Sequence, residues 1–127
     1  MANEYLSVIV TGAASGIGAA CMKLLLARGH RVCAFDRNEI PVAAIDEAER
    51  HRLLSLRGDV ARAEDCRAAA SQAMTAFGKL DALIHMAAIH STSTWTELDA
   101  EEFNRTLSVN VTGSFLMAQA VAEKMQE

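Results

Sequence analysis

The stretch that decides the fold is Thr11-Gly12-Ala13-Ala14-Ser15-Gly16-Ile17-Gly18. It continues from residues 6–11, a short run rich in β-branched residues that predicts a buried strand. It leads into residues 16–28, where apolar residues recur with the period of a helix and predict one buried face: Ile17, Cys21, Leu24 and Leu25. Glycines between a strand and a helix let the backbone turn sharply and approach a pyrophosphate, which the free N–H groups of the helix can bind. This stretch therefore predicts a phosphate-binding loop, in which Ser15 adds a hydroxyl donor; a glycine-rich turn without a ligand is the alternative.

The rest of the chain continues the alternation of short apolar runs and amphipathic segments. Further strands are predicted at 31–36, 53–57 and 80–85. Helices are predicted at 41–50, at 62–77 and from Asp99 to near the C-terminus. In the first of these Val42 and Ile45 face inward, and in the second the buried residues are Cys66, Ala69, Ala70, Ala73 and Phe77. Strands that alternate with helices form parallel sheets with right-handed crossovers, so we predict an α/β, doubly wound, Rossmann-like fold of four strands with helices on both faces.

Composition limits the possible partners. The 127 residues suit a single domain, and 51% of them are hydrophobic. The formal net charge is -4 and the basic residues are scattered singly, which argues against a nucleic-acid partner. No apolar run approaches the roughly 18 residues of a membrane span, so no membrane partner is expected. Three cysteines without metal-ligand spacing (Cys21, Cys33 and Cys66) predict buried thiols in a reducing, cytoplasmic compartment and no metal site.

Asp36 is the candidate selector of the cofactor. It lies at the carboxyl end of the second predicted strand, eighteen residues after Gly18. A carboxylate there can accept hydrogen bonds from both adenosine ribose hydroxyls and would repel a 2′-phosphate, so NAD is favoured over NADP. Arg37 points the other way, because a guanidinium could pair with that phosphate. A turn-forming aspartate without a ligand is the alternative interpretation of Asp36.

The spacing Gly-x-x-x-Gly-x-Gly after a threonine resembles the short-chain dehydrogenase/reductase family, in its common, non-extended branch. The extended branch shows Gly-x-x-Gly-x-x-Gly, and a Walker loop is excluded because no Gly-Lys-Ser/Thr follows. The resemblance implies an NAD(P)-dependent oxidoreductase that moves a hydride between a nicotinamide cofactor and a small alcohol or ketone. It also implies the strand order 3-2-1-4. The cofactor-binding residues that it implies are Gly12, Ser15, Gly16, Ile17, Gly18, Asp36, Asp59, Val60 and Ala87.

The resemblance implies specific roles for Asp59 and Val60. An aspartate at the place of Asp59 bonds the adenine amino group, and the next backbone N–H, here that of Val60, meets a ring nitrogen. The match weakens after the fourth strand, where the family shows Asn-Asn-Ala-Gly and this chain has residues 85–88, His-Met-Ala-Ala. Ala87 still fits beside the cofactor ribose. We expect His85 to bond across the sheet or to pack; a catalytic or metal-binding role for His85 or His90 is the alternative.

The segments that follow bear on substrate and assembly. The hydroxyl-rich stretch 91–94 could touch the nicotinamide or the substrate, or be a solvated loop. Residues 107–113 match the Asn-bearing stretch of the family's fifth helix, where the asparagine bends the helix and holds a water in a proton relay; Asn110 is therefore the candidate catalytic residue. Residues 109–122 are apolar around much of their circumference and need a second packing partner. In relatives this helix forms the main subunit interface, so a homo-oligomer through the C-terminal helix is expected.

The family's catalytic Ser and Tyr-x-x-x-Lys pair have no counterpart in this sequence. Its one tyrosine, Tyr5, is followed four residues later by Ile9. We therefore expect residues 1–127 to be a dinucleotide-binding half-domain, truncated before the catalytic segment and inactive by itself. A naturally short, non-catalytic nucleotide-binding or assembly module is one alternative. An adenosyl-methionine methyltransferase, which also has a glycine loop and an acid after its second strand, is another.

Overall fold

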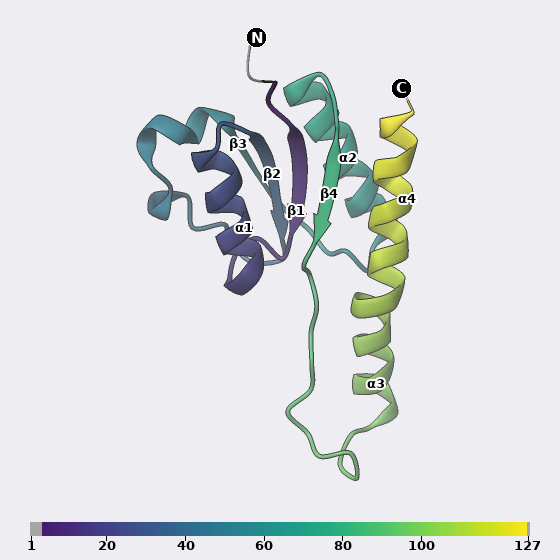
Figure 1. Cartoon of the computed structure of the whole chain (residues 1–127). Helices are drawn as coiled ribbons and strands as arrows, with labels where there is room; N and C mark the ends of the chain where they lie inside the picture. The colour runs from purple at the N-terminus through teal and green to yellow at the C-terminus, as the bar shows by residue number, and fades with distance from the viewer. Residues whose placement is uncertain (1–3, 127) are drawn as a thin grey trace.

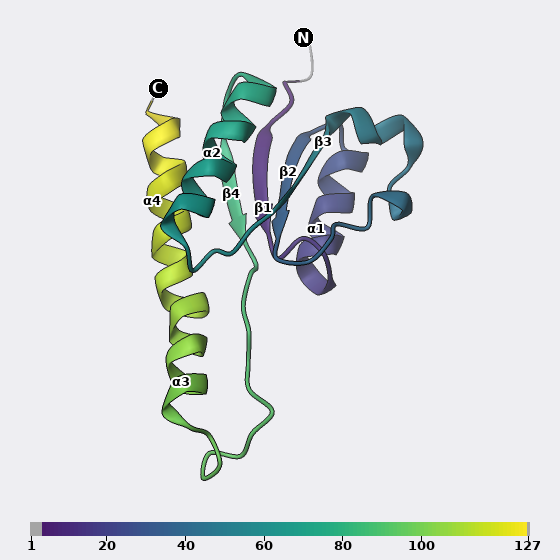
Figure 2. The same ribbon diagram turned by 180° about the vertical axis from the view of Figure 1, so that it is seen from behind.

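The computed structural model describes residues 4–126. Four strands form one parallel sheet in the order β3-β2-β1-β4. The strands are β1 (Ser7–Thr11), β2 (Arg31–Asp36), β3 (Leu53–Arg57) and β4 (Ala82–His85). The helices are α1 (Gly16–Ala27), α2 (Ala63–Phe77), α3 (Ala100–Leu107) and α4 (Gly113–Met125), with 3₁₀ turns η1 (Val42–Ala44) and η2 (Glu47–Arg52) and a π-helical turn η3 (Ser108–Thr112). Helix α1 covers one face of the sheet and α2 with α4 covers the other (Figures 1 and 2). The predicted doubly wound fold and its strand order are confirmed.

The sheet separates two apolar clusters. Side chains alternate between the faces of a strand, so Ile9 and Phe35 pack with α2 and α4, while Val8 and Val10 pack with α1. All five residues of β1 are buried because this strand lies in the middle of the sheet and is covered on both faces. This arrangement explains why the strands are nearly continuous apolar runs. It also brings the carboxyl ends of all four strands to the same edge.

The buried face of α1 differs from the prediction. The buried residues are Gly18, Met22 and Leu26. Of the predicted face, Cys21 and Leu25 are half-buried against the core, whereas Ile17 is 71% and Leu24 51% exposed. The cause is the packing of the glycine loop: a Cβ on Gly18 would lie 2.1 Å from the carbonyl oxygen of Gly12. Because Gly18 has to face the loop, the helix is rotated relative to the face that the apolar residues alone would choose.

The segment between β2 and β3 is the second difference. The predicted single helix over 41–50 is two 3₁₀ turns, η1 and η2, separated by Ile45 in an extended conformation. Ile45 is buried as predicted, and Val42 is half-buried. The side chain of Asp46 accepts a hydrogen bond from the backbone N–H of Ala48, which starts a new turn after Ile45. The predicted helix is therefore interrupted at Ile45 and Asp46, where Ile45 is buried in an extended conformation and Asp46 caps the next turn.

Helix α2 ends and helix α3 begins as the sequence predicts, whereas the single helix predicted from Asp99 to near the C-terminus is divided by η3 into α3 and α4. Helix α2 buries the five predicted residues and ends at Gly78, whose φ of 77° is in the left-handed region. The carboxylate of Asp99 caps α3 by accepting from the backbone N–H of Glu102 at 2.8 Å. Helix α3 continues through η3 into α4, and α4 packs against α2. Helix α3 projects beyond the carboxyl edge of the sheet, beside the 86–98 loop (Figure 1).

The three cysteines are free thiols. Burial raises the pKa of Cys33 to about 12 and that of Cys66 to about 11, which disfavours their thiolate forms. Cys21 is half-buried on α1, and no disulfide joins the three.

Within residues 4–126, no helix combines the length and the apolar character that crossing a membrane would require.

Candidate functional site

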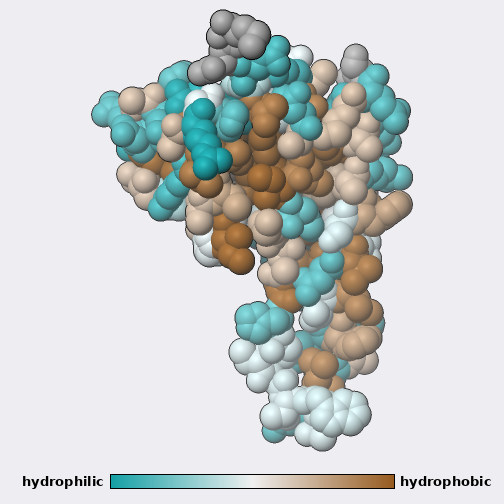
Figure 3. Space-filling view, in the orientation of Figure 1, coloured by the Kyte–Doolittle hydropathy of each residue, from teal (hydrophilic) through white to brown (hydrophobic). Residues whose placement is uncertain are grey.

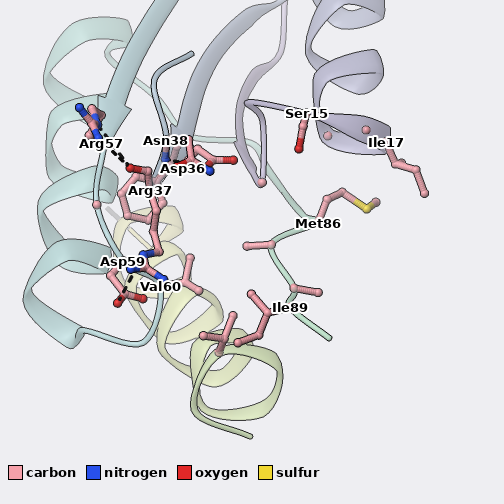
Figure 4. Close-up of a pocket in the computed structure, with 18 of the residues that line it drawn as sticks. Ser15, Ile17, Asp36, Arg37, Asn38, Arg57, Asp59, Val60, Met86 and Ile89 are labelled. Carbon is pink, nitrogen blue, oxygen red and sulfur yellow. Dashed lines mark hydrogen bonds and ion pairs between the residues drawn. The ribbon is translucent and has the colours of Figure 1, made fainter. Parts of the chain in front are cut away.

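A cavity lies at the carboxyl ends of the strands. Its volume is about 920 Å³, within the usual range for a small-molecule site. All nine residues predicted to bind the cofactor line it: Gly12, Ser15, Gly16, Ile17, Gly18, Asp36, Asp59, Val60 and Ala87. They come from four separate segments, namely the glycine loop, the end of β2, the loop after β3 and the chain after β4, and Figure 4 shows these segments around the cavity. The topology therefore gathers residues that lie up to 75 positions apart in the sequence.

The glycine loop has the geometry of an anion-binding turn. Gly12 and Gly16 have φ values of 66° and 56°, which L side chains rarely adopt. A Cβ on Gly12 would also lie 2.8 Å from the backbone nitrogen of Ala87. Helix α1 starts at Gly16 with no acidic residue in its first turn and no hydrogen bond from the side chain of Ser15. The N–H groups and positive dipole end of α1 are therefore available to a phosphate.

Asp36 connects two walls of the cavity. One carboxylate oxygen accepts from the backbone N–H of Ala14 at 3.0 Å, and the other accepts from that of Asn38 at 2.8 Å. The second contact is the turn-forming bond that the alternative interpretation expected, and it coexists with a place in the cavity wall. Since each carboxylate oxygen has two lone pairs, both oxygens keep capacity for ribose hydroxyls.

The loop after β3 is held by an acid that the sequence analysis did not single out. The backbone N–H of Asp59 donates to the carboxylate of Asp65 at 2.9 Å, and Asp59 itself accepts from the N–H of Ala61. A Cβ on Gly58 would lie 2.5 Å from the ring of Phe35, so only glycine fits between β3 and this ring. The sequence feature that could have identified Asp65 is its position in the first turn of α2, six residues after Asp59.

Thr11 is the hydrogen-bond centre between β1 and the chain after β4. Its hydroxyl oxygen accepts from the backbone N–H groups of Met86 and Ala87 at 3.0 and 3.1 Å. It also lies 2.8 Å from Nδ1 of His85. Because the oxygen already accepts twice, we assign its own hydrogen to Nδ1. His85 thus bonds across the sheet, as one of the two interpretations expected.

Burial lowers the pKa of His85 and favours its neutral form, which can accept from Thr11. The ring belongs to β4 and does not line the cavity, whereas His90 does. The hydroxyl-rich stretch lies farther out. There the side chains of Ser91 and Ser93 donate to the carboxylate of Glu102 on α3, which anchors this part of the loop.

Asn110 lies behind the cavity wall rather than in it. Its Nδ2 donates to the carbonyl of Ile89 at 2.7 Å, and its Oδ1 accepts from the N–H of Ile89 at 2.8 Å. Ile89 and Val109 line the cavity, and Asn110 does not. Asn110 lies in η3, and its backbone carbonyl accepts a hydrogen bond from the hydroxyl of Ser114 in α4 at 2.8 Å. The structure therefore gives Asn110 a positioning contact, and its catalytic role stays a prediction.

Comparison with known proteins identifies relatives along nearly the whole chain. A family model described as short chain dehydrogenase matches residues 7–127. D-threitol dehydrogenase of Mycolicibacterium smegmatis is 36% identical over 124 residues, which cover 94% of this chain and 47% of that protein. The 2,5-dichloro-2,5-cyclohexadiene-1,4-diol dehydrogenase of Sphingobium indicum is 38% identical over 111 residues, or 87% of this chain and 44% of that protein.

Solved structures show the same relationship in three dimensions. A short-chain dehydrogenase/reductase of Brucella melitensis, described as glucose/ribitol dehydrogenase, superposes with a TM-score of 0.86 at 26% identity over 98% of this chain and 54% of its own. The 3-ketoacyl-(acyl-carrier-protein) reductase of the same organism, complexed with NADH, gives 0.85 at 28% identity over 95% and 50%. The chain spans about half the length of the curated relatives it matches. By sequence and by fold, the chain belongs to the short-chain dehydrogenase/reductase family.

Proposed function

We propose that the chain is the NAD-binding portion of an oxidoreductase that transfers a hydride between the nicotinamide and a small alcohol or ketone. The observation that carries the proposal is the convergence of nine predicted residues on one cavity at the carboxyl edge of the sheet. Ligands bind at this edge in doubly wound folds. Relatives named as dehydrogenases of polyols and cyclic diols support the substrate class. The NADH complex of a similar structure supports the cofactor.

Each wall of the cavity has a proposed task. The N–H groups at the start of α1 hold the pyrophosphate, and Asp36 accepts from the adenosine ribose hydroxyls. Asp59 and the N–H of Val60 meet the adenine, while Ala87 leaves room for the ribose beside the nicotinamide. When bound, the nicotinamide accepts or donates the hydride. Asn110 holds Ile89, and through it the wall formed by residues 87–90.

We place the catalytic proton donor outside these 127 residues. The sequence has no Tyr-x-x-x-Lys pair, so residues 1–127 are proposed to be the dinucleotide-binding half-domain and to show no turnover by themselves. Free thiols, of which two are buried, suit a reducing compartment, and we propose the cytoplasm. Nucleic acid is not proposed as a partner, because the basic residues are scattered along a chain of net charge -4.

Calorimetry with NAD and NADP tests the proposed function. We expect wild-type protein to bind NAD about tenfold more tightly than NADP, since a carboxylate accepts strongly from hydroxyls and repels a phosphate. Asp36→Asn removes that charge and is expected to erase the preference. Asp46→Asn is the matched control, because Asp46 makes the same kind of bond to a backbone N–H two residues later but lies next to η2. Folded wild-type protein that gives no heat with millimolar NAD contradicts the proposal.

We also propose that α3, η3 and α4 pair with a second copy of the chain. Phe103, Leu107, Val111 and Phe115 follow one another four residues apart, and each is between 43% and 61% exposed. Figure 3 shows apolar surface along this helix as well as over the sheet beside α1. A continuous apolar stripe on a helix marks an interaction surface. In family members the corresponding helix is the expected subunit interface.

Light scattering checks the assembly. The measured mass of the wild-type protein is expected to be a multiple of 13.7 kDa. The double variant Val111→Glu, Phe115→Glu is expected to be a monomer, because the interface would bury two charges without partners. Leu24→Glu is the control, since Leu24 is 51% exposed on α1. A stable oligomer in the double variant would contradict this interface. Assembly without any affinity for a nucleotide would favour the alternative of a non-catalytic module.

A further inference from the structure

Two arginines meet at the adenine end of the cavity. Arg37 follows β2 and Arg57 ends β3, where it lies in register with Asp36. Both side chains line the cavity. Arg57 donates from Nε and Nη2 to the backbone carbonyl of Arg37, at 3.3 and 3.2 Å. The second arginine therefore holds the backbone from which the first one projects.

The side chain of Arg37 points away from the proposed ribose site. Figure 4 shows it running from the end of β2 towards Asp59 and Val60. Its Nε lies 4.0 Å from a carboxylate oxygen of Asp59, with the two side chains 55% and 22% exposed. An ion pair at this distance and exposure contributes little stability, and the guanidinium points towards Asp59. That direction places the guanidinium over the part of the cavity proposed for the base.

The surroundings of Asp36 argue against a 2′-phosphate at the same end. Its two carboxylate oxygens accept from the N–H groups of Ala14 and Asn38, so two hydrogen bonds oppose a movement of the carboxylate that would admit a second anion. Two of the donor groups of Arg57 are used on the carbonyl of Arg37. The side chain of Arg37 is directed at Asp59 instead.

We propose that Arg37 covers the adenine base and that Arg57 is its positioning residue. This inference rests on the proposed function, because it concerns the same cavity. A planar guanidinium binds an aromatic face by stacking and by its charge. The adenine then lies against Arg37, with Asp59 and Val60 at its edge. Arg37 contributes to the binding of any adenine dinucleotide, whether or not it carries a 2′-phosphate.

Calorimetry with NAD and with NADP on the 127-residue chain tests this role. Arg37→Ala is expected to weaken both affinities by the same factor, about fivefold, and to leave the ratio between them unchanged. Arg57→Ala is expected to weaken both by about threefold, and Arg57→Gln to restore most of the loss, because its amide keeps a donor for the carbonyl of Arg37 without the charge. Arg67→Ala, which removes an exposed charge on α2, is the control.

Each outcome separates the possibilities. A loss in Arg37→Ala that is confined to NADP shows a phosphate-binding arginine and overturns the proposal. Equal losses in Arg57→Gln and Arg57→Ala show that its charge matters rather than its hydrogen bonds, and overturn the positioning role. Unfolding midpoints measured in parallel have to stay near that of wild type, since a lowered midpoint with lost binding shows a merely structural role. Wild-type binding of NAD with no change in Arg37→Ala defeats only this inference, whereas no wild-type binding defeats the proposed function as well.

Discussion

Gly18→Ala is expected to lower the free energy of unfolding by about 3 kcal/mol or more and to abolish dinucleotide binding. The new Cβ would lie 2.1 Å from the carbonyl oxygen and 2.6 Å from the carbonyl carbon of Gly12. Both atoms belong to the backbone of the glycine loop, so the clash is relieved only if α1 and the loop move apart. That movement opens the cavity wall and exposes Met22 and Leu26, which are fully buried. Urea unfolding and NAD calorimetry measure the two effects.

Gly16→Ala is the matched control in the same loop. Gly16 has a φ of 56°, but no atom lies within 4 Å of the point that a Cβ would occupy. The expected cost is therefore only that of a left-handed alanine, about 1 to 2 kcal/mol. Because Gly16 lines the cavity, its new methyl group is still expected to hinder a phosphate. If Gly18→Ala were as stable as Gly16→Ala, close packing would not be the reason for glycine at position 18.

Thr11→Val is the second substitution with a large expected effect, about 2 to 4 kcal/mol of lost stability. Valine has nearly the shape of threonine but offers no acceptor to the N–H groups of Met86 and Ala87 and no hydrogen to Nδ1 of His85. Thr11 is fully buried, so water does not readily replace it. The chain after β4 is expected to shift, and the affinity for NAD is expected to fall with it.

Thr11→Ser separates the hydroxyl from the methyl group. Serine keeps the hydrogen bonds and loses one methyl, an expected cost of about 1 kcal/mol. Thermal or urea unfolding of both variants at one pH supplies the comparison. Equal losses in the two variants would mean that packing, rather than the hydrogen bonds at Thr11, holds the wall of the cavity.

Local pattern was sufficient where each residue's environment follows from its neighbours in sequence. The strands β2 and β3 begin and end where the sequence predicted them, and α2 buries its five predicted residues and ends at Gly78. The glycine loop and Asp36 were predictable from their places after the first and second strands, whereas the full set of candidate cofactor residues came from the resemblance to the family. The cavity that they line is a consequence of strand order.

Contacts between distant segments were not predictable from pattern. The bonds of Asn110 to Ile89, of Asp36 to Ala14 and of Arg57 to the carbonyl of Arg37 each join separate segments of the chain. The resemblance made Asn110 the candidate catalytic residue, yet only the fold shows that it bonds to Ile89 from behind the cavity wall. The hydrogen-bond partner of such a side chain lies in another segment, so no periodic pattern in the sequence identifies it.

The amino-acid sequence by itself determined the alternation of strands and helices, the parallel sheet and the edge at which the candidate residues gather. These features follow from hydrophobic period and from the chirality of crossover connections, which act on any chain with this pattern. Tertiary structure alone decided the rotation of α1, the interruption at Ile45 and the direction of Arg37. Each of these depends on close packing or on hydrogen-bond geometry between segments that meet only in the folded chain.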